Sequence, residues 1–216
     1  MINKGTAGVV SSPESDDIQW FDRWAGSYER CAAQFFIDHL QRSCLDLVGE
    51  FSDESNLGVI ADIGCGTGRL LRRARKRWPS ANLVGVDPSR GMLDVACRLM
   101  PSGAFCAGPA ESLPLPDQAV DTVFSTLSIH HWQEVEKGLQ EIVRILHPGG
   151  FFCLADIQIP AMLSKWITHF EGNDPDRWKA LFVQSGLTVL ALKYRLAGFG
   201  LVMLGMKRHG PKNLMD

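Results

Sequence analysis

The chain has 216 residues, of which 45% are hydrophobic, and a formal net charge of −2. That length suits one domain with a full core. The near balance of acidic and basic residues argues against a nucleic-acid footprint over the whole chain, and no run reaches the roughly 18 apolar residues that span a bilayer.

The N-terminal residues 1–17 are rich in Gly, Ser and acidic residues and contain no apolar signal-peptide core. We expect them to form a flexible N-terminus. The six cysteines include no C-x-x-C pair, and several lie inside apolar runs, where a reduced thiol behaves as a small hydrophobic side chain. This cysteine usage favours a cytoplasmic location and indicates no metal site.

Aromatic residues recur at helical spacing in the segment 18–50, where we expect two helices with a break near Asp38. The aromatic stripe consists of Trp20, Phe21, Trp24 and Tyr28. Such a stripe either packs onto the body of the domain or covers the mouth of a ligand site and excludes water. Both interpretations stay open at this point.

Strand-like and helix-like segments alternate over residues 51–209. The expected strands are Gly58–Ile63, Asn82–Val86, Ala104–Ala107, Ala119–Ser125 and Phe151–Asp156. The expected helices are Gly68–Trp78, a segment that starts at Pro88, Val135–Leu146 and Asp176–Ser185. A closing hairpin is expected from Leu187–Leu196 and Phe199–Lys207. This order is typical of one α/β domain with a Rossmann-like sheet.

Residues 59–68 read Val-Ile-Ala-Asp-Ile-Gly-Cys-Gly-Thr-Gly, an apolar strand that ends in an acid and three alternating glycines. Glycine permits a positive φ and close approach of the backbone to a ligand. The N–H groups at the start of the following helix also suit an anion. A dinucleotide fingerprint has two residues before its last glycine, and this turn has one, so a nicotinamide-dependent oxidoreductase is disfavoured.

This D-x-G-C-G-T-G motif resembles that of the class I S-adenosylmethionine-dependent methyltransferases, and closely that of their small-molecule branch. Further matches to this family follow in the same order along the chain. These matches are Val86-Asp87-Pro88-Ser89 with Met92-Leu93, Ala110-Glu111-Ser112-Leu113-Pro114, and the E-x-x-R-x-L-x-P-G-G pattern from Glu141 to Gly150. The resemblance covers residues 59–156 well and the ends loosely.

The resemblance implies a doubly wound sheet of seven strands in the order 3-2-1-4-5-7-6, with the last strand antiparallel. Helices would cover both faces, and residues 18–50 would form an N-terminal helical cap on a cofactor-binding domain at residues 51–209. The implied cofactor is S-adenosyl-L-methionine, which leaves as S-adenosyl-L-homocysteine.

Asp87 lies 25 residues after Asp62, close to the roughly 20-residue spacing of a carboxylate that accepts ribose hydroxyls. The resemblance implies that Tyr28 touches the cofactor and that Met92 packs on the adenine, although Met92 also suits the core. The cofactor-binding residues expected in this way are Tyr28, Asp62, Gly64, Cys65, Gly66, Gly68, Asp87, Pro88, Met92, Ala110, Glu111 and Ser125.

Pro109 departs from the family pattern. Members commonly carry an Asp at this position, and its side chain accepts a hydrogen bond from the adenine amino group. Adenine recognition would then fall to the Ala110 backbone, to the segment around Ala110 and Glu111, or to water.

His130 and His131 follow the fourth expected strand, at the end where open α/β sheets bind ligands. Because histidine can take a proton near neutral pH, they are the candidate catalytic residues. Adjacent side chains do not share one direction, so at most one would face the methyl group. The alternative is local capping and packing, since a His-His pair is widespread in the family across different acceptors.

We therefore expect methyl transfer to a small-molecule acceptor by direct in-line displacement, with no covalent intermediate. The aromatic stripe and an insertion at residues 157–172 suggest an apolar or aromatic acceptor. The alternatives are a protein or RNA methyltransferase, or a cofactor-binding regulatory protein without turnover. The basic run at residues 69–77 would be an RNA contact in the second case and a solvated helix face otherwise. No nucleic-acid or membrane partner is expected, and the acceptor atom and oligomeric state are left open.

Overall fold

The computed structural model describes residues 13–31, 33–53, 57–158 and 174–209, with side chains from residue 17 onward. Seven strands form one sheet in the order β3-β2-β1-β4-β5-β7-β6, and this confirms the expected topology. β7 is antiparallel to both β5 and β6, whereas β1 is parallel to β2 and β4. The strands are β1 (Val59–Ile63), β2 (Asn82–Asp87), β3 (Ala104–Ala107), β4 (Val120–Thr126), β5 (Leu146–Ile157), β6 (Leu187–Arg195) and β7 (Gly200–Lys207).

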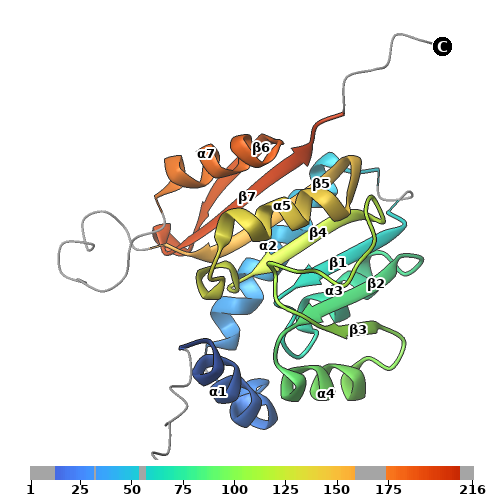
Figure 1. The fold of residues 1–216 in the computed structure, drawn as a ribbon, viewed down its shortest axis with the longest axis vertical. Helices are drawn as coiled ribbons and strands as arrows, with labels where there is room; N and C mark the ends of the chain where they lie inside the picture. The colour runs from blue at the N-terminus through green and yellow to red at the C-terminus, as the bar shows by residue number, and fades with distance from the viewer. Residues whose placement is uncertain (1–12, 32, 54–56, 159–173, 210–216) are drawn as a thin grey trace, which may run out of the picture.

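Helices cover both faces of this sheet, with α5 and α7 in front of it and α2 and α3 behind it in Figure 1. The helices are α1 (Pro13–Tyr28), α2 (Gln34–Phe51), α3 (Arg69–Arg77), α4 (Arg90–Leu99), α5 (Val135–Ile145) and α7 (Pro175–Ser185). The described residues also include the short 3₁₀ turns η2 (Ile129–His131) and η3 (Leu196–Gly198).

Strand β5 shows why the central strands read as continuous apolar runs. Its side chains alternate between two cores, with Phe152 and Leu154 in the core under α5 and α7, and Cys153 and Ala155 in the core under α2 and α3. A strand that is covered on both faces has no solvent-facing side and therefore needs apolar residues at every position.

The break between the two N-terminal helices lies at residues 29–33, so the expected break near Asp38 is wrong. Asp38 lies inside α2, where its carboxylate accepts hydrogen bonds from Arg69 of α3 and pairs with Arg73. An acid in the helical pattern thus marks a contact between two helices. The first helix also begins earlier than expected, at Pro13.

The basic run of α3 is largely an interface with the N-terminal helices. Arg69 and Arg72 pair with Glu29, and Arg77 pairs with Asp46 of α2. Arg75 donates to the carbonyl oxygens of Pro79 and Ala81. Most of these guanidinium groups therefore bind the protein's own oxygen atoms, which corrects the interpretation of the run as a solvated face.

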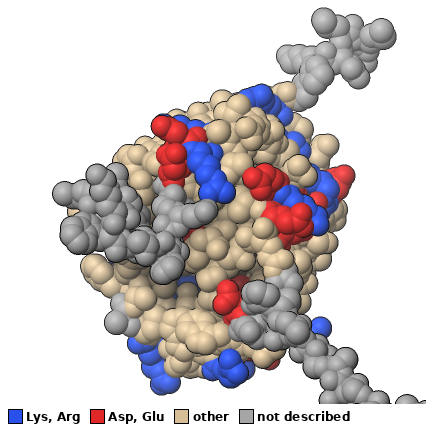
Figure 2. Space-filling model, turned by 60° about the vertical axis from the view of Figure 1, so that its left-hand side comes forward, with Lys and Arg blue, Asp and Glu red and all other residues tan. Residues whose placement is uncertain are grey.

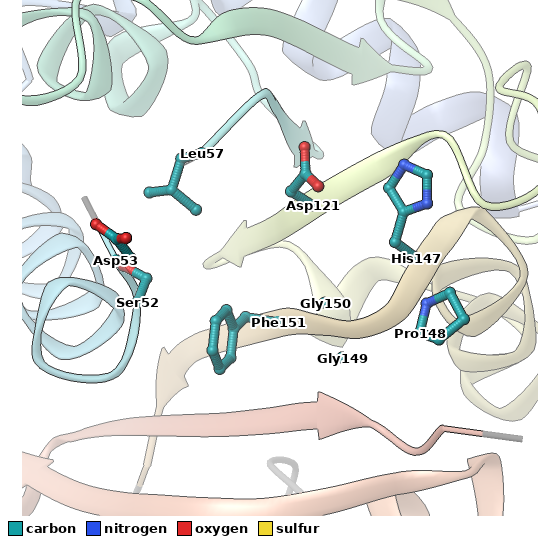
Figure 3. A pocket seen from close by; sticks show the side chains of 9 residues that line it. All are labelled: Ser52, Asp53, Leu57, Asp121, His147, Pro148, Gly149, Gly150 and Phe151. Atoms are coloured by element: carbon teal, nitrogen blue, oxygen red, sulfur yellow. The ribbon is translucent and has the colours of Figure 1, made fainter. Parts of the chain in front are cut away.

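Strand β5 begins at Leu146, before the expected start at Phe151. The pairing with β4 passes from Val120–Leu146 to Thr122–Phe151, so His147-Pro148-Gly149-Gly150 forms a bulge. These residues line a hollow of about 210 Å³ with Asp121, at the opposite end of the strands from their carboxyl ends (Figure 3). The Asp121 carboxylate accepts from the Val59 N–H at 2.7 Å, so this acid joins β1 to β4.

The expected insertion at residues 157–172 lies outside the described residues, apart from Ile157 and Gln158. Within the ranges that the structure describes, no helix has the length and apolar character that a membrane crossing requires.

Candidate functional site

The glycine turn, residues 64–68, joins β1 to α3 and lies against the ends of β2 and β4. The Gly64 and Cys65 N–H groups both donate to the Val86 carbonyl, at 2.8 and 3.1 Å. Gly64 has φ +72°, and a Cβ there would lie 1.9 Å from the Ser128 Oγ, so the segment after β4 presses directly on the turn. Only glycine meets both conditions.

Gly66, in the middle of the turn, borders open space. Its φ is +51°, and no described atom lies within 4 Å of the place a Cβ would take. Gly68 then begins α3 in the left-handed conformation. The turn therefore presents bare backbone to a space at the carboxyl ends of β1 and β2, where open α/β sheets bind ligands.

Two buried carboxylates flank this space. Asp87 accepts from the Gly66 N–H at 2.8 Å and from the Ser89 N–H at 2.9 Å. Burial raises its pKa to about 6, although these two hydrogen bonds oppose the shift. Burial, followed by the charge of Asp87, raises the pKa of Asp62 to about 8.

Neither carboxylate forms a salt bridge within the described part of the chain, and the Asp62 Oδ1 has no hydrogen-bond partner there. A buried carboxylate is costly unless a donor or a cation satisfies it. The pair of Asp62 and Asp87 therefore suits a ligand that brings hydroxyl or N–H donors and positive charge.

Helix α1 covers the same space from the side of α4. Ala25, Phe21 and Tyr28 pack around Met92 and Val95. Asp22 accepts from the Ser89 Oγ at 2.5 Å and from the Gly91 N–H at 2.8 Å, so an acid of α1 caps the start of α4. This contact holds α1 against α4, whereas α2 packs in the core behind the sheet.

Tyr28, at the end of α1, lies close to Asp87. Burial raises the pKa of its hydroxyl to about 12, and the nearby charges of Asp87 and Glu29 act in the same direction. The expected contact of Tyr28 with the cofactor stays a prediction.

Glu29 ties the end of α1 to the glycine turn and to α3. Its carboxylate accepts from the Thr67 Oγ1, from Arg69 at 2.7 Å and from Arg72 at 2.9 Å. Although burial opposes it, these donors hold the pKa of Glu29 below its ordinary value. The cluster of Glu29, Thr67, Arg69 and Arg72 is called the Glu29 cluster below.

Several expected cofactor residues have structural contacts of their own. Cys65 lies in the core, where burial raises the pKa of its thiol, and Met92 is buried under α1. Glu111 accepts from the N–H groups of residues 133 and 134, before α5. Pro88 is exposed between Asp87 and α4, and Ala110 is buried beside Glu111. Ser125 is fully buried at the end of β4, and its Oγ lacks a described partner.

The two histidines stand on η2, between the glycine turn and α1. The His130 Nδ1 contacts both carboxylate oxygens of Asp156, at 2.8 and 3.0 Å. The His131 Nδ1 lies 3.6 Å from Asp17 of α1, and its ring packs edge-on against Phe21. The rings lie 4.1 Å apart, but they contact carboxylates from different elements.

Burial and the neighbouring His130 lower the pKa of His131. Asp156 is fully buried at the end of β5 and also accepts from the Ile157 N–H at 2.6 Å. His131 is thus joined to the cap, whereas His130 is joined to the sheet.

A separate apolar hollow of about 380 Å³ lies at the same end of the sheet, lined by Phe36, Ile157, Leu196 and Phe199. Ile157 and Asp156 are consecutive in a strand, so this hollow lies on the α2 side of β5 and the Asp156–His130 pair on the other. Figure 2 turns this side of the molecule forward, and the charged residues there gather in separate groups around a largely uncharged middle.

Sequence reasoning missed three acids of this region: Asp22, Glu29 and Asp156. A signal existed for Asp156, because it lies near the carboxyl end of an apolar strand, as Asp62 and Asp87 do. The partners of Asp22 and Glu29 lie 67 and 38 residues away, and no local pattern indicates them.

The fold and this site define a nucleoside-binding class of Rossmann-like proteins, and comparison with known proteins narrows that class. The family model described as "Methyltransferase domain" matches residues 61–154. A malonyl-[acyl-carrier protein] O-methyltransferase of Serratia marcescens is 36% identical over 60% of this chain and 48% of its own length. A trans-aconitate 2-methyltransferase of Escherichia coli is 30% identical over 66% of this chain and 57% of its own.

Among solved structures, an S-adenosylmethionine-dependent methyltransferase from Thermotoga maritima matches 88% of this chain and 99% of its own, with a TM-score of 0.67 at 22% identity. Residues 61–154 therefore match a methyltransferase domain, and the relatives and the solved structure to which the chain is similar are methyltransferases. It spans about half the length of the curated relatives it matches.

Proposed function

We propose that this protein transfers a methyl group from S-adenosyl-L-methionine to a small-molecule acceptor. The observation that carries the proposal is the pair of buried carboxylates, Asp62 and Asp87, beside the open backbone of Gly66. The cofactor brings ribose hydroxyls for Asp87, an ammonium group, and a sulfonium that supplies an activated methyl group. A ligand of this charge offsets the cost of two buried acids, whereas a pyrophosphate would add to it.

In this proposal the chain binds, orients and dehydrates the reactants. Asp87 accepts the ribose hydroxyls, and the glycine turn lets the backbone approach the ligand. Tyr28 and the rest of α1 exclude water. Placing an acceptor in line behind the methyl group at near-attack distance can supply several kcal/mol of the barrier, so a covalent intermediate is not needed.

The small-molecule acceptor is supported by the curated relatives, whose names specify trans-aconitate and a malonyl group carried on an acyl-carrier protein. An apolar or aromatic body is supported by the hollow that Phe36 and Phe199 line. The RNA alternative loses its main support, because most of the guanidinium groups of α3 bind carboxylates or carbonyls of this chain. The cytoplasmic location expected from cysteine usage stays part of the proposal.

Thermal unfolding tests the cofactor. With S-adenosylmethionine or S-adenosylhomocysteine at about 100 times its dissociation constant, the protein gains about 2.7 kcal/mol, a rise in Tm of about 5–10 °C. NAD should give no rise, and Asp87→Ala should lose most of it. Asp94→Ala, an exposed acid on α4, is the matched control and should respond as the wild type does.

A protein that responds to NAD, or to neither S-adenosyl ligand, would contradict the proposal. A clear response to both S-adenosyl ligands without turnover on any metabolite would favour a regulatory protein.

A further inference from the structure

The hydrogen bond between His130 and Asp156 has a defined donor and a defined acceptor. An ionised carboxylate can only accept hydrogen bonds, so the His130 Nδ1 that lies 2.8 Å and 3.0 Å from its two oxygens carries a proton. In a neutral imidazole the other nitrogen, Nε2, is then the basic one. Asp156 thus selects the tautomer in which Nε2 can take a proton.

Burying the Asp156 carboxylate costs desolvation free energy, so we expect the pair to have a function. Its side chain is 0% exposed, and within the described ranges its donors are the His130 ring and the Ile157 N–H. An apolar residue at this position would avoid the desolvation cost of a buried acid. A strongly held acid–histidine pair beside a ligand site is typical of proton transfer.

The position of η2 joins this pair to the cofactor site. Ser128 presses on Gly64 of the glycine turn, and Phe21 and Asp17 of α1 contact His131. The His130–Asp156 pair therefore lies where the cap, the glycine turn and the end of β5 meet. Among the described residues, the charged and titratable groups next to His130 are Asp156, His131 and, beyond His131, Asp17.

We infer that His130 is a general base, that Asp156 is its positioning residue, and that the acceptor is a neutral hydroxyl compound. The inference rests on the proposed methyl transfer. As the acceptor oxygen bonds to the methyl carbon, the methyl–sulfur bond breaks and its electron pair stays on sulfur. The hydroxyl proton passes to the His130 Nε2, so the positive charge of the sulfonium ends on the imidazolium.

The hydroxyl acceptor inferred for this chain differs from the carboxylate acceptors that the relatives' names specify. Malonyl and aconitate acceptors offer carboxylates, which are already ionised at neutral pH and need a cation rather than a base. Arg195, the cation next to the apolar hollow in sequence, donates to the Ser43 Oγ and to the Tyr194 carbonyl. An alcohol or phenol gains most from a base, because its oxygen becomes a good nucleophile only as the proton leaves.

The first test reads the tautomer of His130 without turnover. Two-dimensional ¹⁵N NMR of the full chain, with His130→Gln for assignment, should show Nδ1–H and an unprotonated Nε2 at pH 7.5. Asp156→Asn should alter this pattern. If Nε2 carries the proton in the wild type, it cannot act as a base and the inference is overturned.

The second test uses paired acceptors that share one apolar or aromatic skeleton and end in either a hydroxyl or a carboxylate. Hydroxyl members should be methylated and carboxylate members should not. His130→Gln should lower kcat by about 10²- to 10⁴-fold, with a smaller change in KM and an unchanged thermal response to S-adenosylhomocysteine. His39→Gln, an exposed histidine on α2, is the control and should keep wild-type turnover.

If Asp156→Asn does not fold, the tautomer of the wild type and the partly exposed His130→Gln still decide. Methylation of carboxylates alone, no turnover of any hydroxyl member by a protein that binds S-adenosylmethionine, or an equal loss in His131→Gln would overturn the inference. Failure of S-adenosylmethionine to bind at all would instead overturn the proposed function.

Discussion

Residues 62–92 supply most of the proposed cofactor contacts from two consecutive strand–turn–helix units, β1–α3 and β2–α4. His130 and Asp156, by contrast, lie on η2, which follows β4, and near the end of β5, and they are 26 residues apart in sequence. The cofactor side thus depends on local turn geometry, whereas the acceptor side depends on the packing of η2 against β5. The difference explains how the acceptor could change without the cofactor site: a change at the end of β5 leaves the glycine turn intact.

The largest expected effect is at Gly64, where the cofactor side contacts the segment that leads to the histidines. Gly64→Ala places a Cβ against Ser128 and forces a non-glycine residue to φ +72°. The backbone strain alone costs about 1–3 kcal/mol, and the overlap with Ser128 adds to it. Urea unfolding should show this loss, and S-adenosylhomocysteine should no longer raise the Tm.

Gly26→Ala is the matched control for Gly64→Ala, because nothing lies within 4 Å of a Cβ at that place in α1. It should stabilise the protein by about 0.5–1 kcal/mol. Equal behaviour of the two variants would show that the contact between Ser128 and the turn is unimportant.

The next effect concerns the cofactor side alone, through Asp62. Its pKa rises from 3.8 to about 8 on folding. Between these values the folded state holds a proton that the unfolded state has lost, so the free energy of unfolding falls as pH rises from about 4 to about 8. Asp62→Asn, a neutral isostere, should remove this fall, which is up to about 1.4 kcal/mol per pH unit.

Urea unfolding of the ligand-free protein at pH 5 and pH 8 measures the effect of Asp62→Asn. The variant should gain stability relative to the wild type as the pH rises. Parallel pH dependences for the two proteins would mean that Asp62 is ionised throughout.

A smaller effect concerns the cap that both sides share. Glu29→Gln weakens the Glu29 cluster, so α1 should open more often and S-adenosylhomocysteine should dissociate faster, by about fivefold for each 1 kcal/mol lost. Stopped-flow release measures the rate, and high salt should bring the wild type closer to the variant.

Asp46→Asn is the control for the Glu29 cluster. Its partner Arg77 also belongs to α3, but the Asp46 side chain is 70% exposed and lies away from the glycine turn. An exposed pair contributes little, so the release rate should not change. If Asp46→Asn speeds release as much as Glu29→Gln does, α3 as a whole and not the cluster controls the cap.

The smallest expected effect is at Pro109, where the family pattern has an acid. Pro109→Asp restores an acceptor for the adenine amino group at an exposed position. One added hydrogen bond contributes about 0.5–1.5 kcal/mol, so the Kd for S-adenosylhomocysteine should fall by a few-fold, as measured by calorimetry. Pro109→Asn tests whether an amide oxygen serves as well, and unchanged affinity in both would mean that adenine is bound elsewhere.

The amino-acid sequence by itself determined the closing hairpin and the glycine turn with Asp62 and Asp87, whereas the sheet order followed from the resemblance to a known family. The hairpin and the glycine turn depend on alternation, turn residues and short spacings, which can be recognised within a short stretch of sequence. The prediction of a break near Asp38 was wrong for the opposite reason. The partners of this carboxylate, Arg69 and Arg73, are distant in sequence and meet it only in the folded protein.

Only the tertiary structure decided which partner each acid and histidine has. Asp22 and Glu29 close α1 over the site, and Asp156 orients His130, through contacts between residues 26 to 67 positions apart. Nothing local requires these pairs; they form because the sheet brings the ends of β4 and β5 together and the hydrophobic face of α1 packs on α4. Burial then makes each pairing necessary, since an acid removed from water must find a donor.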